Sequence, residues 1–305
     1  MCRILVLYYS QSGEVTKAVT SFIKHLDTPH NEVVWECIKP KETYPYPWKS
    51  VYEFFDVFPE CVNLEPPEIE PPSFDPDQKF DLIILAYQVW FLAPSLPIQG
   101  FLKSPYARVM QNTKVITLIV CRSMWHSASE TMKQIIAEQD GILIDNVVVT
   151  FKGPPLATFI STPRRLLSGK KDKFMGLPEA ETDNEDIKML EMFGKAVAEH
   201  VESLPDDSHR SLLKGLGAVK VNRRYAVLER IGYYSYHYPW AKVARLFGGP
   251  KSSLRRPIIY MFVGNLVLTL PLGLFLALII QPLISPFLHN QIEDYINQLE
   301  SPSGS

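Results

Sequence analysis

Two serines and a glycine near the start of the chain have the types and spacing of an anion-binding loop. The apolar run 4–9 gives way to Ser10, Ser12 and Gly13, and an amphipathic segment begins at Glu14. Hydroxyls and unpaired backbone N–H groups at a helix N-terminus can hold a phosphate or another anion. An ordinary turn between a strand and a helix fits the same residues about equally well. The position of the loop, directly after the first strand of an alternating pattern, favours a ligand site.

Apolar runs of strand length alternate with amphipathic segments along the first two thirds of the chain. The pattern predicts strands at 3–9, 32–38, 81–87, 113–120 and 142–151. It predicts helices at 14–26, 125–139 and 184–204, the last capped by Asp183 or Asn184. Five strands with interleaved helices indicate a parallel three-layer α/β domain over residues 1–204. Both doubly wound strand orders fit this count.

Two further loops follow the third and fourth predicted strands. Because parallel strands end at the same edge of a sheet, we expect both loops to lie beside the first one. The loop at 88–97 carries an aromatic pair, and the loop at 121–126 carries the only cation of the three, Arg122. A guanidinium in the crevice can stabilise an anion or orient an enolate, and it can equally pair with a neighbouring acid. Taken singly, such aromatic side chains belong more often to a core than to a ligand site.

The three loops resemble those of flavodoxin-like proteins, whose first loop holds the phosphate of FMN with hydroxyl and backbone groups. One departure is Val15, which stands where the family usually has a second threonine, with Thr16 next to it. The second loop is similar to the flavin loop of the quinone-reductase branch, where an aromatic pair and a proline lie beside the isoalloxazine ring. The resemblance implies FMN as cofactor, no metal, and cofactor contacts from Ser10, Gln11, Ser12, Gly13, Glu14, Val15, Gln88, Val89, Trp90, Phe91, Arg122, Ser123, Met124 and Trp125.

A long insertion, 39–78, separates the second and third predicted strands. It holds nine of the 25 prolines and eight aromatic residues, and plain connections of this length are uncommon. We expect a semi-rigid lid over a hydrophobic substrate, with a short helix near 50–58. A packed excursion that touches no ligand is an equally good interpretation. The expected lid residues are Tyr46, Trp48, Phe54, Phe55 and Phe58.

The net charge of −2 conceals an uneven distribution. Residues 208–256 carry eleven lysines and arginines against the single acid Glu229, a balance of +10, so the rest of the chain carries −12. Cations interleaved with tyrosine and tryptophan suit a nucleic acid or a membrane interface. The following segment, 257–288, has no Asp, Glu, Lys or Arg and is long enough to cross a bilayer, which favours a membrane and no nucleic acid.

These features predict a basic aromatic neck at 205–256, a membrane segment at 257–288 and a polar tail at 289–305. By the positive-inside rule the α/β domain lies on the cytoplasmic face of the inner membrane, with the tail on the other side. Pro271 and Gly273 leave a second topology open, a re-entrant hairpin of two short helices that keeps the tail on the cytoplasmic side. The four cysteines lack metal-ligand spacing and are expected to be reduced and mostly buried.

Several segments resemble the bacterial dialkylresorcinol condensing enzymes: Tyr44-Pro45-Tyr46-Pro47-Trp48 and the stretches 53–60, 83–95 and 121–125. The resemblance implies a flavoprotein aromatase of dialkylresorcinol biosynthesis, which oxidises a lipidic dialkylcyclohexanedione supplied by a ketosynthase partner. No Ser/His/Asp or Cys/His nucleophilic set is evident, which favours redox chemistry over condensation. Two alternatives remain: a membrane-tethered NAD(P)H:quinone reductase, and a non-enzymatic membrane scaffold of flavodoxin-like fold.

Overall fold

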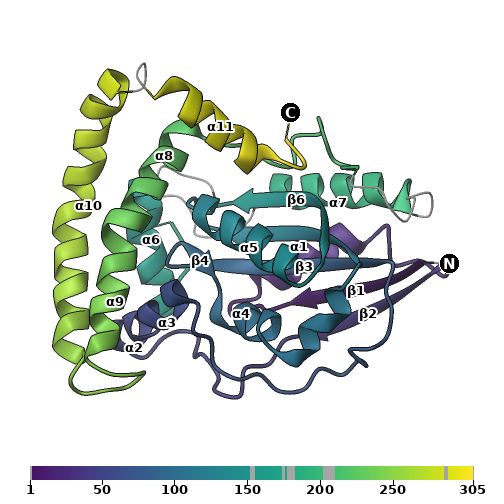
Figure 1. Ribbon diagram of the computed structural model, residues 1–305, viewed down its shortest axis with the longest axis horizontal. Coiled ribbons are helices and arrows are strands. Elements are labelled where there is room, and N and C mark those ends of the chain that lie inside the picture. The colour runs from purple at the N-terminus through teal and green to yellow at the C-terminus, as the bar shows by residue number, and fades with distance from the viewer. Residues whose placement is uncertain are drawn as a thin grey trace.

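The computed structural model describes residues 2–151, 155–173, 176, 183–201, 210–284 and 288–304. Its main sheet consists of five parallel strands: β1 (Cys2–Tyr8), β2 (Asn31–Cys37), β3 (Leu82–Trp90), β5 (Lys114–Cys121) and β6 (Ile142–Thr150). The spatial order β2-β1-β3-β5-β6 reverses direction between β1 and β3 (Figure 1). This is the flavodoxin-like doubly wound order, and it decides between the two orders that the sequence left open.

Helices cover both faces of the sheet, as expected for strands that are apolar on both sides. One face carries α1 (Glu14–Ile23) and α7 (Asn184–Ala198), and the other carries α4 (Leu96–Leu102), the 3₁₀ turn η1 (Pro105–Met110) and α5 (His126–Glu138). Helix α7 begins with a capping box built on Asp183, one of the two expected caps. It approaches α1 so closely that a Cβ on Gly194 would lie 1.8 Å from the carbonyl oxygen of Phe22.

The insertion contains two short helices, α2 (Val51–Asp56) and α3 (Phe58–Asn63), where one was expected. Ser50 caps the first helix, and Pro59 lies in the first turn of the second, where its missing N–H costs nothing. The α/β domain also has a helix that was not predicted, α6 (Pro155–Ser168), after the last strand. The expected domain boundary at 204–205 lies outside the described residues.

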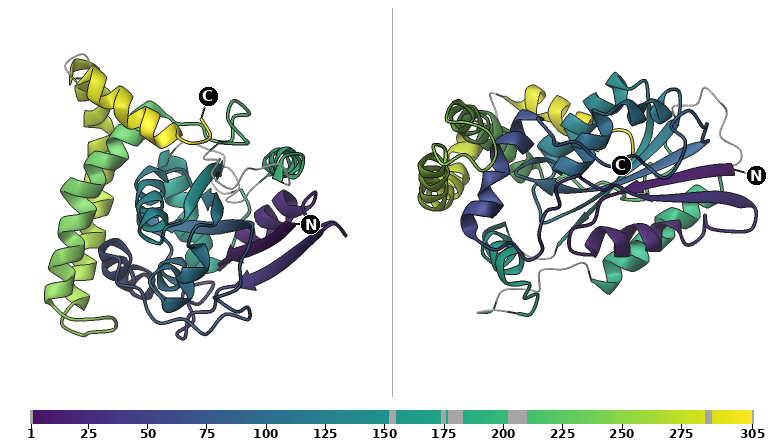
Figure 2. Two further views of the ribbon diagram at one scale, coloured as in Figure 1. Left: turned by 45° about the vertical axis from the view of Figure 1, so that its right-hand side comes forward. Right: turned by 90° about the horizontal axis from the view of Figure 1, so that it is seen from below.

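The C-terminal third forms helices that pack on α2, α3 and α5. Helix α8 (Arg223–Gly232), the π-helical turn η3 (Tyr233–His237) and α9 (Tyr238–Leu246) make one long rod, and α10 (Arg256–Ile284) returns beside it. Figures 1 and 2 show this pair standing along the edge of the domain beyond β4. The segment expected to be a neck is therefore a wall of the domain.

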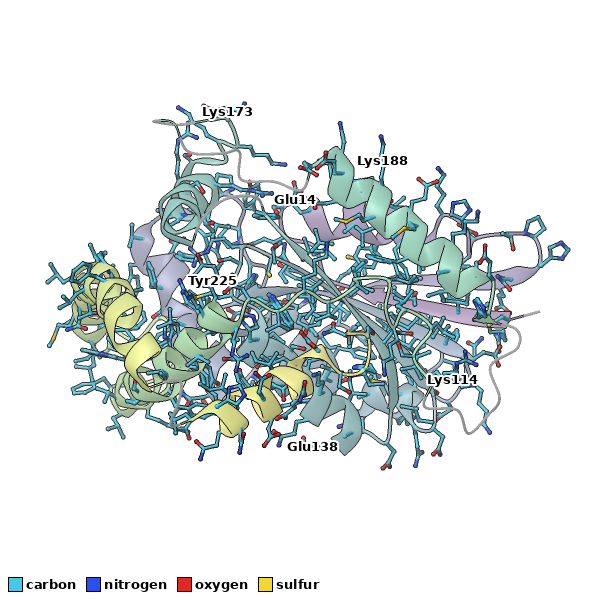
Figure 3. The ribbon with its side chains drawn as sticks, turned by 90° about the horizontal axis from the view of Figure 1, so that it is seen from above. Glu14, Lys114, Glu138, Lys173, Lys188 and Tyr225 are labelled. Carbon is cyan, nitrogen blue, oxygen red and sulfur yellow. The ribbon has the colours of Figure 1, made fainter. Side chains whose placement is uncertain are left out.

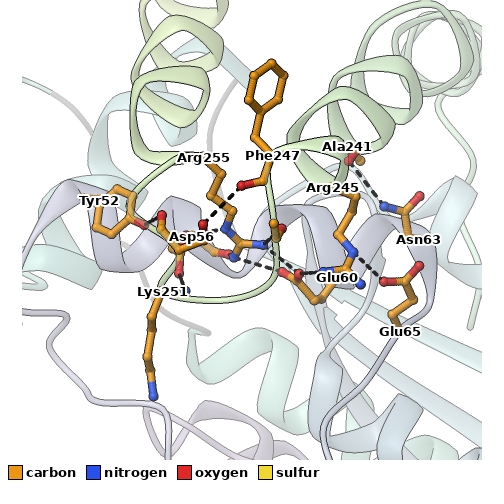
Figure 4. A network of polar contacts seen from close by, with 12 residues as sticks. Tyr52, Asp56, Glu60, Asn63, Glu65, Ala241, Arg245, Phe247, Lys251 and Arg255 are labelled. Atoms are coloured by element: carbon orange, nitrogen blue, oxygen red, sulfur yellow. Dashed lines mark hydrogen bonds and ion pairs between the residues drawn. The ribbon is translucent and has the colours of Figure 1, made fainter.

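A buried arginine connects this wall to the insertion (Figure 4). Arg255, at the start of α10, donates to the Asp56 carboxylate at 2.7 Å and to the Glu60 carboxylate at 2.7 and 3.1 Å. The Arg255 side chain is fully buried and the two carboxylates nearly so. Arg245 of α9 adds ion pairs to Glu60 and Glu65. The cations of the basic segment are thus partly used within the fold, where they hold α2 and α3 against α9 and α10.

The tail differs from the expected topology. Helix α11 (His289–Glu300) packs on α5 and α8, and the Ser303 hydroxyl donates to the buried carboxylate of Asp145 at 2.6 Å. Helix α10 has 29 residues, a length of about 43 Å, so a crossing would carry the tail to the far side of a bilayer, away from these contacts. The expected span with its tail outside is therefore not the arrangement seen, and neither is a hairpin of two short helices, because α10 runs on through Pro271 and Gly273.

Candidate functional site

A largely apolar cavity of about 180 Å³ lies where the strands end. The loops after β1, β3 and β5 all contribute to it, so the three loops singled out in the sequence meet in one place. The lid helix α2, helix α6 and the C-terminal helices supply the other walls. The lining residues are Gln11, Phe54, Phe55, Val89, Trp90, Phe91, Leu92, Cys121, Arg122, Met124, Thr162, Pro163, Leu166, His237 and Leu266.

The aromatic loop after β3 is a tight hairpin with strained residues at its tip. Strand β3 pairs antiparallel with β4 (Ala93–Pro94), and the two turn residues Phe91 and Leu92 have φ values of 50° and 64°. Two-residue turns with positive φ normally use Asn or Gly, because a side chain costs energy there. Phe91 packs on Phe54 at a ring distance of 5.2 Å, and both turn residues line the cavity. The strained turn therefore places the side chains of Phe91 and Leu92 at the crevice.

The first loop has the backbone of an anion site. Gly13 precedes α1 with φ 85°, a conformation that favours glycine, and the Ser10 hydroxyl accepts a hydrogen bond from Thr16 N–H at 3.2 Å. The Val15 side chain is fully buried in the core between α1 and the sheet. Valine at position 15, in place of the usual threonine, thus removes one hydroxyl and leaves the loop with two serines and the N-terminus of α1.

Two cations from beyond β6 reach this loop. Arg165 of α6 donates to the Ser12 hydroxyl at 3.0 Å and to the Glu14 carboxylate at 3.0 Å, and Lys171 lies 2.9 Å from the same carboxylate. Glu14 and Arg165 are both buried, and Figure 3 shows Glu14 beneath the segment that carries Lys173. Arg165 and Lys171 thus bring two cations to the Glu14 carboxylate and to the positive end of α1, an arrangement that favours an anion.

Several buried polar atoms around the cavity have no hydrogen-bond partner in the part of the chain that the structure describes. They include Thr162 Oγ1, on the cavity wall, and two atoms of residues next to lining residues: Gln88 Oε1, in β3, and Ser123 Oγ, in the third loop. A buried polar atom without a partner costs about 1–3 kcal/mol, so native proteins usually satisfy it. These atoms suit a ligand that is flat and apolar on its faces and polar at its edge.

Arg122 and Cys121, at the third loop, are shifted in their pKa values by burial, with different consequences for each. Burial lowers the pKa of Arg122 to about 10, so the guanidinium is still a cation at neutral pH. Burial, with the nearby Glu229 carboxylate, raises the pKa of the Cys121 thiol well above its usual range. A thiol that does not ionise is a poor nucleophile, and the cavity therefore offers an anion-stabilising group without a covalent catalyst.

Some of the expected site residues lie outside the cavity. Trp125 is buried against the His126 ring, with centroids 4.4 Å apart, and Phe58 stacks on Phe262 of α10 at 4.1 Å. Tyr46 accepts a hydrogen bond from Arg165, and Trp48 packs edge-on against Trp90. Trp125, Phe58 and Trp48 support the walls, because aromatic rings packed against other rings have little face left for a ligand, and Tyr46 is engaged by Arg165. Phe54 and Phe55 are the two expected lid residues that reach the cavity.

The sequence reading missed the contributions of α6 and of the C-terminal helices. Arg165 and Thr162 follow the last strand, and two adjacent arginines next to Pro163 were the one available signal. His237 and Leu266 come from segments interpreted as a neck and a membrane segment. Their placement depends on pairs such as Arg255 with Asp56, which are 199 residues apart in the chain.

No protein-family model matches the chain, and no curated protein sequence matches it. Among solved structures, a flavodoxin from the domain Archaea aligns with a TM-score of 0.37 and 11% identity, over 66% of this chain and 99% of that one. A putative flavoprotein from Bacteroides eggerthii aligns with a TM-score of 0.39 and 14% identity, over 52% of this chain and 95% of that one. A WrbA-like flavodoxin from Agrobacterium tumefaciens aligns with a TM-score of 0.35 and 11% identity, over 67% of this chain and 99% of that one. With scores of this size, the strand order remains the basis for the flavodoxin-like fold.

Proposed function

We propose that this protein is an FMN-dependent oxidoreductase that acts on an apolar ring substrate at a membrane surface. The observation that carries the proposal is the meeting of an anion loop and an aromatic, apolar cavity at the carboxyl edge of a doubly wound sheet. In such sheets ligands bind at the point where the strand order reverses. That point lies between β1 and β3, the strands that precede the first two loops.

The residues present fit FMN. The loop 10–15, with Arg165 and Lys171, would hold the phosphate, and the cavity walls at Trp90, Phe91 and Met124 would hold the ring system. The unpaired Thr162 hydroxyl on the cavity wall would supply a polar contact for the edge of the ring or for the ribityl chain, and Gln88 and Ser123 lie next to lining residues. When bound, FMN accepts a hydride from a substrate carbon, and the protein binds and orients the substrate and excludes water.

The favoured substrate is a dialkylcyclohexanedione, which loses two hydrogens to become a dialkylresorcinol. Phe54, Phe55 and Leu266 form an apolar wall suited to alkyl chains, and Arg122, which lines the same cavity, would stabilise an enolate oxygen. The high pKa of Cys121 supports oxidation over condensation, so a separate ketosynthase would have to supply the ring. A quinone reductase would use the same cavity, and it differs in requiring a nicotinamide donor.

The outer face of α10 supports membrane association in the plane of the surface. Among the described helices, one 18-residue window (Arg256–Gly273) is long and apolar enough to cross a membrane. Its domain side is apolar, as usual for a packed helix, but its solvent side is apolar too, with Val267, Leu268, Leu272 and Phe275 all more than half exposed. Surface helices of soluble domains carry polar residues there. Lys242, Lys251 and Arg256 near the start of this face would favour anionic lipid.

The absorption spectrum of the purified protein tests the redox proposal. We expect a flavin spectrum that bleaches when a dialkylcyclohexanedione is added without oxygen. Bleaching by NAD(P)H and not by the dione would favour the quinone reductase. Absence of flavin, with none taken up from added FMN, would overturn the proposal. The non-enzymatic membrane scaffold would then be the remaining alternative.

Sedimentation with vesicles tests the surface. Leu268→Glu should reduce binding to vesicles that contain anionic lipid, because a charge replaces one of the most exposed apolar side chains of α10. Met192→Glu is the matched control, since Met192 is also about half exposed but lies on α7, at the opposite side of the domain (Figure 1). Equal loss in both variants would argue against α10 as the lipid-facing element.

A further inference from the structure

A histidine from the C-terminal rod forms part of the cavity wall. His237 ends the π-helical turn η3, and single π-helical turns occur frequently at functional sites. The turn places His237 on the cavity together with Arg122 of the third loop and Leu266 of α10. The ring is surrounded by aromatic groups, with the centroids of Phe58 and Phe262 about 6 Å away.

The hydrogen bond of His237 fixes its tautomer. Nδ1 lies 3.3 Å from the carbonyl oxygen of Gly232. A carbonyl oxygen can only accept, so Nδ1 carries the hydrogen and Nε2 of the neutral ring is left with a lone pair. Gly232 is the only hydrogen-bond partner of this ring among the described residues. Nε2 is therefore an acceptor on a ring that borders an apolar cavity.

The surroundings keep this ring neutral. Burial lowers the pKa of His237 to about 4, against the hydrogen bond to the Gly232 carbonyl and the Glu229 carboxylate of α8, which raise it, and Arg122 lowers the pKa further. The other groups that face the ring, from α3 and α10, are the uncharged side chains Phe58 and Phe262. At neutral pH the imidazole is therefore uncharged and keeps the Nε2 lone pair, and Arg122, a cation, lines the same cavity.

We infer that His237 is the proton acceptor of this site, with Arg122 as the group that stabilises the resulting enolate. The inference rests on the proposed function, since it names the base for the cyclic diketone. The C–H bond on a ring carbon next to a carbonyl breaks, and its proton forms the N–H bond at Nε2. The electron pair moves into the new C=C bond as the C=O pair moves to oxygen, beside the guanidinium. This step requires no oxidant.

Hydrogen–deuterium exchange at the ring carbon measures this proton transfer without any redox turnover. The protein with its FMN is incubated without oxygen in D₂O with a saturated cyclohexane-1,3-dione that is quaternary at the carbon expected to donate hydride, which blocks dehydrogenation. NMR then follows deuterium at ring positions 4 and 6. Relative to wild type, His237→Asn should slow the catalysed exchange about 100-fold or more, the usual contribution of a positioned base. Asparagine can still donate to Gly232, so folding and FMN content should be retained.

Two further variants separate a base from a structural residue. His237→Ala should regain exchange when imidazole is added, because the small side chain leaves room for an external base. His200→Asn should exchange at the wild-type rate, since the His200 ring also bonds a backbone carbonyl, that of Ala196, but lies on the exposed end of α7. Wild-type exchange in His237→Asn with FMN bound would overturn the assignment and leave the proposed function standing. A wild-type protein that neither binds FMN nor catalyses exchange would overturn both.

Discussion

Replacing Arg165 with glutamine should weaken FMN binding and leave riboflavin binding unchanged. The Arg165 side chain is 3% exposed and donates at 3.0 Å to Ser12, in the loop that would hold the phosphate. Riboflavin lacks the phosphate and otherwise presents the same ring and ribityl chain. A change confined to FMN would therefore locate Arg165 at the phosphate.

The size of the effect follows from the burial. A hydrogen bond to a charged group contributes about 1.5–3 kcal/mol, and the buried position of Arg165 leaves little water to replace it. Because about 1.4 kcal/mol corresponds to a tenfold change, the FMN dissociation constant should rise roughly 10-fold to 150-fold. Glu14 competes for the same guanidinium, so Glu14→Gln should tighten FMN binding several-fold and make it less dependent on Arg165.

Titration of flavin fluorescence against the apoprotein measures both ligands. Arg164→Gln is the matched control, because Arg164 is the adjacent residue of α6 but bonds Asp172 at the surface. A parallel loss of riboflavin binding in Arg165→Gln would indicate a disturbed fold. Unchanged FMN binding would refute the assignment of the phosphate to this loop.

Three other changes test the C-terminal helices. Arg255→Met should lower the free energy of unfolding by about 3–5 kcal/mol, measured by urea denaturation, because it leaves the Asp56 carboxylate buried without its cation; a loss below 1 kcal/mol would mean that water replaces the arginine. Asp145→Ala should increase amide hydrogen exchange around Ser303 by about tenfold or more, since a buried charge-assisted bond to the tail is lost; unchanged protection would show that α11 alone holds the tail. Glu229→Gln should increase exchange at the start of α5, where the carboxylate accepts from the His126 and Ser127 N–H groups; equal protection would assign the docking of α8 to apolar contacts.

The sheet and its covering helices were predictable from the sequence because their signal is local. A strand buried on both faces reads as a continuous apolar run, as β3 and β5 do, and a strand end followed by small polar residues marks a loop at the ligand edge. Strand boundaries shifted by one to three residues, for instance β3, which continues to Trp90 because β4 extends the pairing there, and helix α7 ends at Ala198, six residues before the expected end. The strand order required knowledge of which strands pair, which no local pattern supplies.

The C-terminal third was read as a neck and a span because composition does not reveal long-range docking. A helix that is apolar all round satisfies the criteria for crossing a bilayer and those for packing against a domain. The distinguishing contacts come from elsewhere in the chain: Asp56 for Arg255, and Asp145 for Ser303. Val15 deprives the expected phosphate loop of a hydroxyl, and the cation that compensates for this loss, Arg165, lies 150 residues further along the chain.

The same helix that offers an apolar face to the outside also lines the cavity. Leu266 belongs to the cavity wall, and the next residues, Val267 and Leu268, are exposed on the outer face of α10. One helix diameter, about 10 Å, therefore separates the exposed apolar face of α10 from the proposed site. A long-chain dione dissolved in a bilayer would reach the cavity by displacing side chains of α10 or α2, without passing through water. The apolar outer face of α10 and its cavity-lining side thus lie on one helix, as the proposed membrane association and the proposed site together require.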